Sequence, residues 1–324
     1  MHALTRMEAR PNEMYEELVR SLRDVAAVKT DEPLARHTTF GIGGPADVFV
    51  TVRNAGELAQ AVVDTRRAGA PYFILGAGSN ILVGDRGIRG VVIDNQAKHV
   101  TAPREVDGAW TVRAESGASF AALARNLARQ GFGGIEWGCG IPGTLGGAVV
   151  YNAGAYGGCI ADVLQSVSIL AADEQTKEVQ APDLKLSYRN SVFTRGECPG
   201  CVVLATTLAV THGDANALVR RIAEIDAQRL GAQPRGRNSG STFKNPDGRH
   251  AWELIDAVGL RGHRIGDAMF SNKHANFIEN LGGASAADVA ALIREAQRRV
   301  NEQFAIGLVT EVELVGEGFG EDTA

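Results

Sequence analysis

The chain has 324 residues, 44% of them hydrophobic, which is enough for two or three domains with substantial cores. Its net charge of -5 argues against a broad surface for nucleic acid or anionic membranes, because such surfaces need a basic face. Its low aromatic content (6%) argues against a platform for stacking nucleic-acid bases. No apolar run reaches the length of a bilayer span, and the N-terminal residues lack the apolar core of a signal peptide. We therefore expect a cytoplasmic enzyme or binding protein that binds neither nucleic acid nor membrane.

Residues 1–100 predict a first lobe in which helices and strands alternate, an α+β or α/β pattern. Asn54 is placed to cap one helix, with Glu57 three residues later as in a capping box. Apolar periodicity and turn residues predict a helix over 14–28, strands over 47–52, 72–75 and 91–94, and the capped helix from Asn54 to about Gly69.

Residues 101–212 predict a second lobe, and residues 213–324 a C-terminal domain whose last strand is expected to return toward the N-terminal lobes. Ser285 and Asp288 have the spacing of a second capping box. The acidic end 316–324 is predicted to be solvated. The expected elements are strands over 110–114, 163–170, 202–210 and 308–315, and helices over 119–130, 214–229, 251–258 and 285–304.

The cysteines give little evidence for a metal site. Cys198 and Cys201 have half of a zinc-site spacing, but no second pair or histidine lies at ligand spacing. Because Pro-Gly separates them, the motif is typical of an ordinary turn, with a redox dithiol as the less favoured alternative in a reducing compartment.

Three glycine-rich turns, at 41–44, 76–80 and 138–158, come at the ends of apparent β segments. The third holds eight glycines in 21 residues, with apolar residues between them, so it is not a flexible linker. Amide groups in such turns can form donor arrays for pyrophosphate oxygens. The turn at 76–80 lacks the third glycine of a Rossmann fingerprint and leads into an apolar run instead of a helix. Together the turns predict a dinucleotide held by backbone groups on a fold that is not Rossmann.

Two polar motifs have both a functional and a structural interpretation. Arg189 beside Tyr188 has the donors to clamp a carboxylate or phosphate, or it is a surface arginine. Ser241 near Lys244 has the groups for a proton transfer, or it belongs to a capped turn.

His274 and Glu311 likewise have both a functional and a structural interpretation. The motif around His274 suits a sugar or phosphate, yet a structural histidine is the more common outcome. Because successive side chains of a strand point to opposite faces, Glu311 and Glu313 are predicted to lie on the same face of the last predicted strand. A buried face would make Glu311 a candidate catalytic acid, whereas a solvated face would make both residues ordinary surface charges.

Taken together, seven ordered motifs across residues 33–316 resemble the UDP-N-acetylenolpyruvoylglucosamine reductase family, which makes UDP-N-acetylmuramate for peptidoglycan. The short connection between Tyr156 and Ser187 is similar to the type II form. The motifs are HTTFGIGGPAD, LGAGSNILV, GCGIPGTLGGAVVYNAGAYG, SYRNSVF, GSTFKNP, NKHANFI and TEVELVG. The resemblance implies an α+β chain with a PCMH or vanillyl-alcohol-oxidase type of FAD-binding fold in two lobes, plus a C-terminal α/β substrate-binding domain.

The resemblance also implies non-covalent FAD, NADPH as reductant and a UDP-sugar substrate, and we expect a monomer. The implied FAD contacts are Gly41, Gly43, Gly44, Gly76, Ala77, Gly78, Ser79, Asn80, Gly138, Gly140, Ile141, Pro142, Gly143, Gly146, Gly147, Asn152 and Gly154. The implied substrate contacts are Tyr156, Tyr188, Lys244, Asn245 and His274.

By the same resemblance, the catalytic positions are Arg189, Ser241 and Glu311. In the implied reaction NADPH reduces FAD and leaves, and FAD N5 then passes a hydride to the terminal carbon of the enolpyruvyl ether. Arg189 and a protonated Glu311 would stabilise the enolate that results, and Ser241 would donate a proton to C2.

Two other functions share parts of this pattern. Another FAD-linked oxidoreductase of the same superfamily, such as a hydroxy-acid or alcohol oxidase, would not need the set Arg189, Ser241 and Glu311. A flavin- or sugar-nucleotide-binding protein without turnover would keep the glycine turns and tolerate the loss of Ser241.

Overall fold

The computed structural model describes residues 12–320, which form two compact units. The first unit comprises the described residues up to Thr30, Val48–Gly76 and Gly90–Ala227. The second comprises Asp31–Asp47, Ala77–Arg89 and the described residues from Gln228 onward. Each unit is therefore assembled from three separate stretches of the chain. The division into three parts at residues 100 and 212 stays a prediction.

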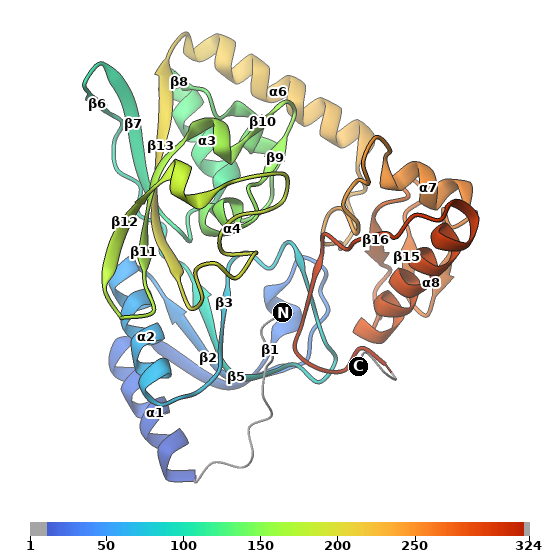
Figure 1. The fold of residues 1–324 in the computed structure, drawn as a ribbon, viewed down its shortest axis with the longest axis horizontal. Helices are drawn as coiled ribbons and strands as arrows, with labels where there is room; N and C mark the ends of the chain where they lie inside the picture. The colour runs from blue at the N-terminus through green and yellow to red at the C-terminus, as the bar shows by residue number, and fades with distance from the viewer. Residues whose placement is uncertain (1–11, 321–324) are drawn as a thin grey trace. The chain divides into compact units, whose positions relative to one another are not determined.

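The N-terminal sheet has the strand order β1-β2-β5-β3, with β3 and β5 parallel. Helices α1 and α2 lie side by side (Figure 1), and Leu22 and Leu58 are fully buried in a core that they share with the first unit's strands. The elements are α1 (Asn12–Val25), β1 (Ala27–Pro33), β2 (Pro45–Val52), α2 (Ala55–Arg67), β3 (Tyr72–Leu75) and β5 (Ile88–Asn95).

The larger sheet of the first unit is antiparallel, in the order β12-β11-β13-β7-β6. Helices α3 and α4 pack on it, and Phe120 and Leu145 share one core with Leu208 of β13. The strands are β6 (Arg104–Val106), β7 (Ala109–Glu115), β8 (Phe132–Gly133), β9 (Gly154–Ala155), β10 (Gly158–Cys159), β11 (Leu164–Leu170), β12 (Thr176–Gln180) and β13 (Val202–His212). The helices are α3 (Phe120–Arg129), η2 (Glu136–Gly140), α4 (Leu145–Val150), α5 (Ile160–Val163), η3 (Ala181–Leu184) and α6 (Ala215–Ala232).

The second unit has its own apolar core, in which Leu254 of α7 and Leu292 of α8 pack with Phe270 of a three-stranded sheet. That sheet has the order β14-β15-β16, and a separate pair joins β17 to β4 in parallel. The elements are η1 (Leu34–His37), β4 (Ile81–Val83), α7 (Ala251–Ala257), β14 (Arg264–Ile265), β15 (Ala268–Phe270), β16 (Ile278–Asn280), α8 (Ala286–Phe304) and β17 (Glu313–Val315).

The predicted N-caps at Asn54 and Ser285 are confirmed, and the predicted capping box is complete at Ser285, whereas Glu57 bonds the amide of Arg53 instead of that of Asn54. Asn54 Oδ1 accepts the amide of Glu57 at 2.9 Å, and the Glu57 carboxylate reaches back to the amide of Arg53 at 2.6 Å. Ser285 Oγ accepts the amide of Asp288 at 3.1 Å, and the Asp288 carboxylate accepts the amide of Ser285 at 3.0 Å. The two cap side chains thus satisfy the amides of Glu57 and Asp288, which lie in the first helical turn and have no partner within the helix.

The predicted solvated end is wrong for Phe319 and for the backbone around it, although Glu317 and Gly320 are exposed. The amides of Asp85 and Arg86 donate to the carbonyls of Gly318 and Glu317, and Phe319 is only 7% exposed. These backbone bonds hold the segment on the loop that follows β4. Residues 321–324 lie outside the described residues.

The Cys198–Cys201 motif forms the expected turn, closed by the Cys201 amide and the Cys198 carbonyl at 3.1 Å. The structure also joins the two cysteines in a disulfide, so the turn contains a cysteine pair of the kind that we had considered only as the less favoured alternative. The turn brings their Cα atoms to 5.5 Å, inside the usual range for a disulfide.

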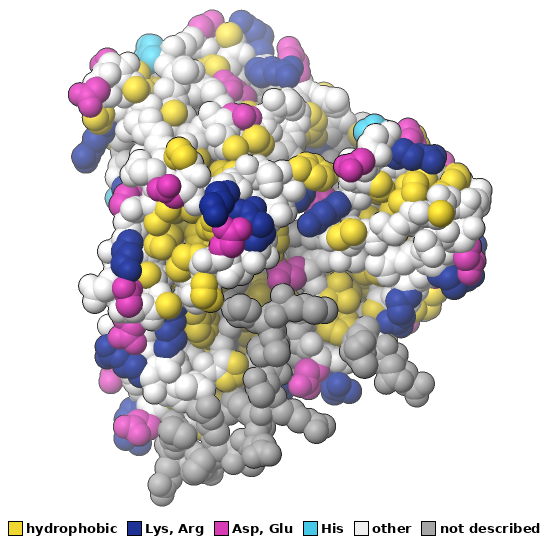
Figure 2. Space-filling model, in the orientation of Figure 1, with side chains coloured by type: hydrophobic (Ala, Val, Ile, Leu, Met, Phe, Trp, Pro, Cys, Tyr) yellow, Lys and Arg dark blue, Asp and Glu magenta, His cyan; other side chains and the backbone are white. Residues whose placement is uncertain are grey.

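Charged side chains of both signs are interspersed over the face drawn in Figure 2, and they do not gather into one basic patch there. This agrees with the mild negative charge of the whole chain. Across residues 12–320, no helix combines the length and the apolar character that crossing a membrane requires.

Candidate functional site

The glycine-rich segment 138–158 packs tightly within the first unit. A Cβ on Gly138 would lie 2.6 Å from the Phe120 ring, and one on Gly158 would lie 2.5 Å from the Trp137 indole. Phe120 and Trp137 themselves meet edge to face, with ring centroids 5.1 Å apart. At these two positions the protein's own aromatic rings therefore require glycine, so the residue type there is no evidence for a cofactor.

The amides at the start of α4 are also used within the protein. Leu145 and Gly146 donate to the carbonyls of Ala118 and Ser116, at 2.9 and 2.8 Å. Thr144 Oγ1 caps the amide of Gly147 at 3.5 Å. The donor array expected from this segment is thus largely consumed by internal hydrogen bonds, and its FAD contacts stay predictions.

In the second unit, the segments around the two other glycine turns are joined by backbone hydrogen bonds. The amide of Thr39 donates to the carbonyl of Gly78 at 3.0 Å, and the amide of Gly44 donates to the carbonyl of Gly84 at 3.0 Å. Within the described part of the chain, the amides of Ala77, Gly78 and Asn80 have no protein acceptor. Neighbouring amides of this kind are what a phosphate group binds, so these residues fit the diphosphate of a dinucleotide.

Ser241 and Glu311 lie on adjacent segments of the second unit. The amide of Glu311 donates to the carbonyl of Thr242 at 2.8 Å, and the amide of Lys244 donates to the carbonyl of Val309 at 2.9 Å. Ser241 is half-buried, directly before the buried side chain of Thr242. The structure therefore brings a hydroxyl and a carboxyl group, two of the three predicted catalytic groups, into one small region.

The predicted face shared by Glu311 and Glu313 is wrong. Strand β17 begins only at Glu313, which is exposed, whereas Glu311 lies in a bend before the strand and is half-buried. The parallel pairing with β4 starts at Glu313, opposite Ile81. Glu311 is therefore oriented by the bend, and strand periodicity does not apply to it.

Two asparagines fix these segments. Asn80 donates from Nδ2 to the carbonyl of Glu311 at 3.1 Å, and its own carbonyl accepts the amide of Glu313 at 3.0 Å. Asn276, which is 3% exposed, bonds both the amide and the carbonyl of Phe243, at 2.9 and 2.8 Å. The role of Asn276 could not be predicted from the sequence, because a buried asparagine that bonds a backbone 33 residues away has no local signature.

Two predicted substrate contacts make structural interactions in the second unit. Asn245 Oδ1 accepts the amide of Ala251 at 3.0 Å, at the start of α7. The ring of His274 meets those of Phe277 and Trp252, at centroid distances of 4.8 and 6.4 Å, and its Nδ1 accepts the amide of Asn276 at 3.3 Å. Substrate contact by either residue stays a prediction.

Burial, with a smaller contribution from nearby Arg261, lowers the pKa of His274 below its usual 6.5. The folded state thus binds this proton less readily than the unfolded chain does. The contribution of neutral His274 to the free energy of unfolding is therefore fully present above pH 6.5. It falls as the pH decreases from 6.5 toward the pKa of His274 in the folded state.

His274→Gln should remove this dependence on pH. The difference in unfolding free energy between wild type and the variant should shrink on acidification from about pH 7 to about pH 5, by at most ~1.4 kcal/mol per pH unit. Urea denaturation at several pH values measures it. A difference that stays constant across this range would contradict a neutral, buried His274.

Arg189 lies in a tight turn of the first unit. Reciprocal backbone hydrogen bonds at 3.1 Å join Ser187 and Asn190, and Tyr188 and Arg189 form the tip. Arg189 has a φ of 53°, a left-handed conformation that costs a non-glycine residue about 1–2 kcal/mol. Its guanidinium donates to the carbonyl of Gly154 at 3.3 Å and lies over the Tyr188 ring at 5.5 Å. Surrounding contacts therefore orient this arginine, and it is only half-buried.

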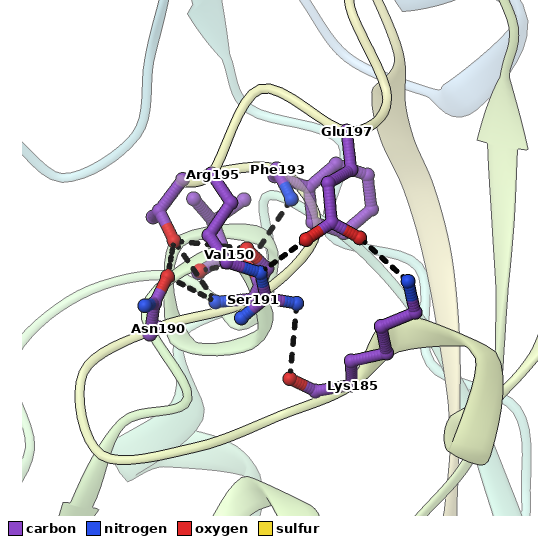
Figure 3. A network of polar contacts seen from close by, with 8 residues as sticks. Val150, Lys185, Asn190, Ser191, Phe193, Arg195 and Glu197 are labelled. Carbon is purple, nitrogen blue, oxygen red and sulfur yellow. Dashed lines mark hydrogen bonds and ion pairs between the residues drawn. The ribbon is translucent and has the colours of Figure 1, made fainter.

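A polar network fixes the chain just after this turn (Figure 3). Ser191, fully buried, donates from Oγ to the carbonyl of Val150 at 2.5 Å. The Glu197 carboxylate lies between Lys185 and Arg195, at 2.8 and 2.5 Å, and their hydrogen bonds lower the pKa of Glu197 below its usual value. The network anchors one end of the Arg189 turn.

Comparison with known proteins gives family matches over both halves of the chain. Residues 46–180 match an FAD binding domain, and residues 232–315 match the C-terminal domain of UDP-N-acetylenolpyruvoylglucosamine reductase. The reductase of that name from Lachnoclostridium phytofermentans is 40% identical over 90% of this chain and 93% of its own length. The reductase from Clostridium botulinum (strain 657 / Type Ba4) is 38% identical over 94% of this chain and 98% of its own length. The crystal structure of UDP-N-acetylenolpyruvylglucosamine reductase from Thermus caldophilus has a TM-score of 0.74 and 36% identity, and the match covers 90% of this chain and all of that one.

These matches confirm several predictions. The FAD-binding model confirms the flavin cofactor, and with the relatives it confirms the oxidoreductase class. The FAD-binding model and the Thermus caldophilus structure confirm the predicted α+β fold class, with an FAD-binding fold and the C-terminal domain of the reductase family.

Proposed function

The chain belongs to the UDP-N-acetylenolpyruvoylglucosamine reductase family, and on this premise we propose that it makes UDP-N-acetylmuramate for peptidoglycan synthesis. The substrate is UDP-N-acetyl-3-O-(1-carboxyvinyl)-glucosamine, whose enolpyruvyl group is reduced with NADPH as the reductant. The observation that carries the proposal is the pairing of the Ser241 and Glu311 segments, with Asn80 on the Glu311 carbonyl.

In this proposal the amides of Ala77, Gly78 and Asn80 hold the FAD diphosphate. When bound, FAD supplies the hydride that reaches the terminal carbon of the enolpyruvyl group. Asn80 would then make two kinds of contact. Its backbone N–H would bind the FAD diphosphate, while its side-chain Nδ2 and its backbone carbonyl bond the backbone of Glu311 and Glu313.

Arg189 binds the substrate carboxylate, for which the paired donors of a guanidinium are well suited. Glu311 is protonated and donates a hydrogen bond to the enolate oxygen, since an ionised carboxylate there would repel the developing charge. Ser241 gives its proton to C2. A serine hydroxyl is a weak acid, so the reaction needs a dry site, and the half-buried position of Ser241 beside buried Thr242 supports this role.

NADPH oxidation by the purified holoenzyme should depend on the enolpyruvyl sugar nucleotide. UDP-N-acetylglucosamine, which lacks the enolpyruvyl group, is the matched control and should not support turnover. Absorbance of NADPH and the mass of the product, two hydrogens heavier than the substrate, are measured. A rate of NADPH oxidation that does not depend on the enolpyruvyl sugar nucleotide and needs only oxygen would favour an oxidase instead.

A further inference from the structure

We propose that Asn152 is a positioning residue for Arg189, with a side chain that holds the turn presenting the guanidinium to the substrate carboxylate. The inference rests on the proposed function, because it gives Asn152 an effect only through the role of Arg189. All of the contacts that support it lie in the first unit.

Asn152 is 6% exposed, and both ends of its side-chain amide bond to the protein backbone. Its Nδ2 donates to the carbonyl of Ser187 at 2.8 Å, at the base of the Arg189 turn. Its Oδ1 accepts the amide of Ala161 at 3.0 Å, in the first turn of α5. Asn152 therefore joins the Arg189 turn to α5, two segments that are distant from each other along the chain.

A second contact ties the Asn152 segment to the Arg189 turn. Asn152 bonds Ser187, and two residues further along both segments the carbonyl of Gly154 accepts the guanidinium of Arg189 at 3.3 Å. Ser191 adds a third tie, through its hydrogen bond to the carbonyl of Val150. Segments 150–154 and 187–191 are thus joined at both ends of the Arg189 turn and at its tip.

The backbone of Arg189 makes such ties necessary. A left-handed arginine relaxes readily to a more common conformation unless its neighbours hold it, and relaxation would redirect the guanidinium. Asn152 is itself left-handed, with a φ of 41°, a conformation that asparagine tolerates better than most residues. This explains why asparagine suits the position, since it supplies both the backbone shape and the donor to Ser187.

Two variants separate these properties. Asn152→Asp keeps the size and the Oδ1 acceptor but places an oxygen against the Ser187 carbonyl. Asn152→Gly removes the side chain and keeps the left-handed backbone without strain. Asn126→Asp, on the exposed face of α3, is the matched control and should behave as wild type.

Anaerobic stopped-flow separates flavin reduction by NADPH from flavin reoxidation by the sugar nucleotide. In both Asn152 variants we expect reoxidation to slow by about 10–100-fold, the effect of a small displacement of a substrate-binding group. FAD content should be retained, and reduction by NADPH should change by less than about threefold. Combining Asn152→Asp with Arg189→Ala should slow reoxidation no further than Arg189→Ala alone, because Asn152 acts through Arg189.

Reoxidation at the wild-type rate in both variants, or an additional slowing of the Arg189→Ala protein, would overturn the inference. So would loss of FAD with normal reoxidation in the reconstituted protein, since that is the pattern of a cofactor contact. If Asn152→Asp does not fold, the reoxidation rate of Asn152→Gly decides between these outcomes. Arg189→Ala alone tests the proposed function separately, because a normal reoxidation rate in that variant contradicts the role of Arg189 whatever Asn152 does.

Discussion

Ser241→Ala should block reoxidation of the flavin by the enolpyruvyl sugar nucleotide while flavin reduction by NADPH stays within about twofold of wild type. Removing a positioned general acid slows its step by roughly 10²–10⁴-fold, and Ser241 takes part only in the transfer of a proton to C2. Both half-reactions are followed by anaerobic stopped-flow absorbance of the flavin.

Ser21→Ala is the control for this variant. It also removes a hydroxyl and one hydrogen bond, from Ser21 Oγ to Asp64, but it lies in α1 and has no part in the proposed chemistry. Both of its half-reactions should match wild type. Equal slowing of reduction and reoxidation in Ser241→Ala would remove Ser241 from the role of proton donor.

Arg189→Ala should slow reoxidation by about 10²–10³-fold, as expected for the loss of one donor to a developing oxyanion. Arg189→Lys should lie between the alanine variant and wild type, because lysine keeps the charge and loses the paired donors that fit a carboxylate. Single-turnover rates at saturating sugar nucleotide measure the effect.

An exposed arginine provides the comparison for Arg189. Arg221, on α6, pairs only with Glu224 at the surface among the contacts described, and Arg221→Ala should leave reoxidation unchanged. A lysine variant as slow as the alanine variant would contradict the contribution that we assign to the positive charge alone. A full rate in Arg189→Ala would contradict the proposed stabilisation of the enolate.

Local features of the fold could be predicted because they depend on a few neighbouring residues. The caps at Asn54 and Ser285 need only a side chain and an amide three residues later. Strand β1 was not predicted, and the helix expected to reach residue 28 ends at Val25. The β1 sequence AVKTDEP is polar and mostly exposed, so it has no apolar alternation to identify it.

The candidate site was recognised from its motifs, but the physical reasons for several residues differ from those expected. The segment 138–158 was interpreted as a glycine-rich turn that holds the dinucleotide, whereas Phe120 and Trp137 occupy the space beside its Gly138 and Gly158. The position of Glu311 depends on a bend and on a hydrogen bond from Asn80, 231 residues earlier. Such contacts arise only from the tertiary fold, and sequence spacing carries no record of them.

The proposed roles of Ser241 and Arg189 can be tested by a crystal structure of the holoenzyme with the enolpyruvyl sugar nucleotide bound. We expect Ser241 Oγ within about 3.5 Å of C2 and the Arg189 guanidinium at hydrogen-bond distance, about 2.7–2.9 Å, from the substrate carboxylate. A bound substrate whose C2 faces another proton donor, with its carboxylate away from Arg189, would contradict these roles.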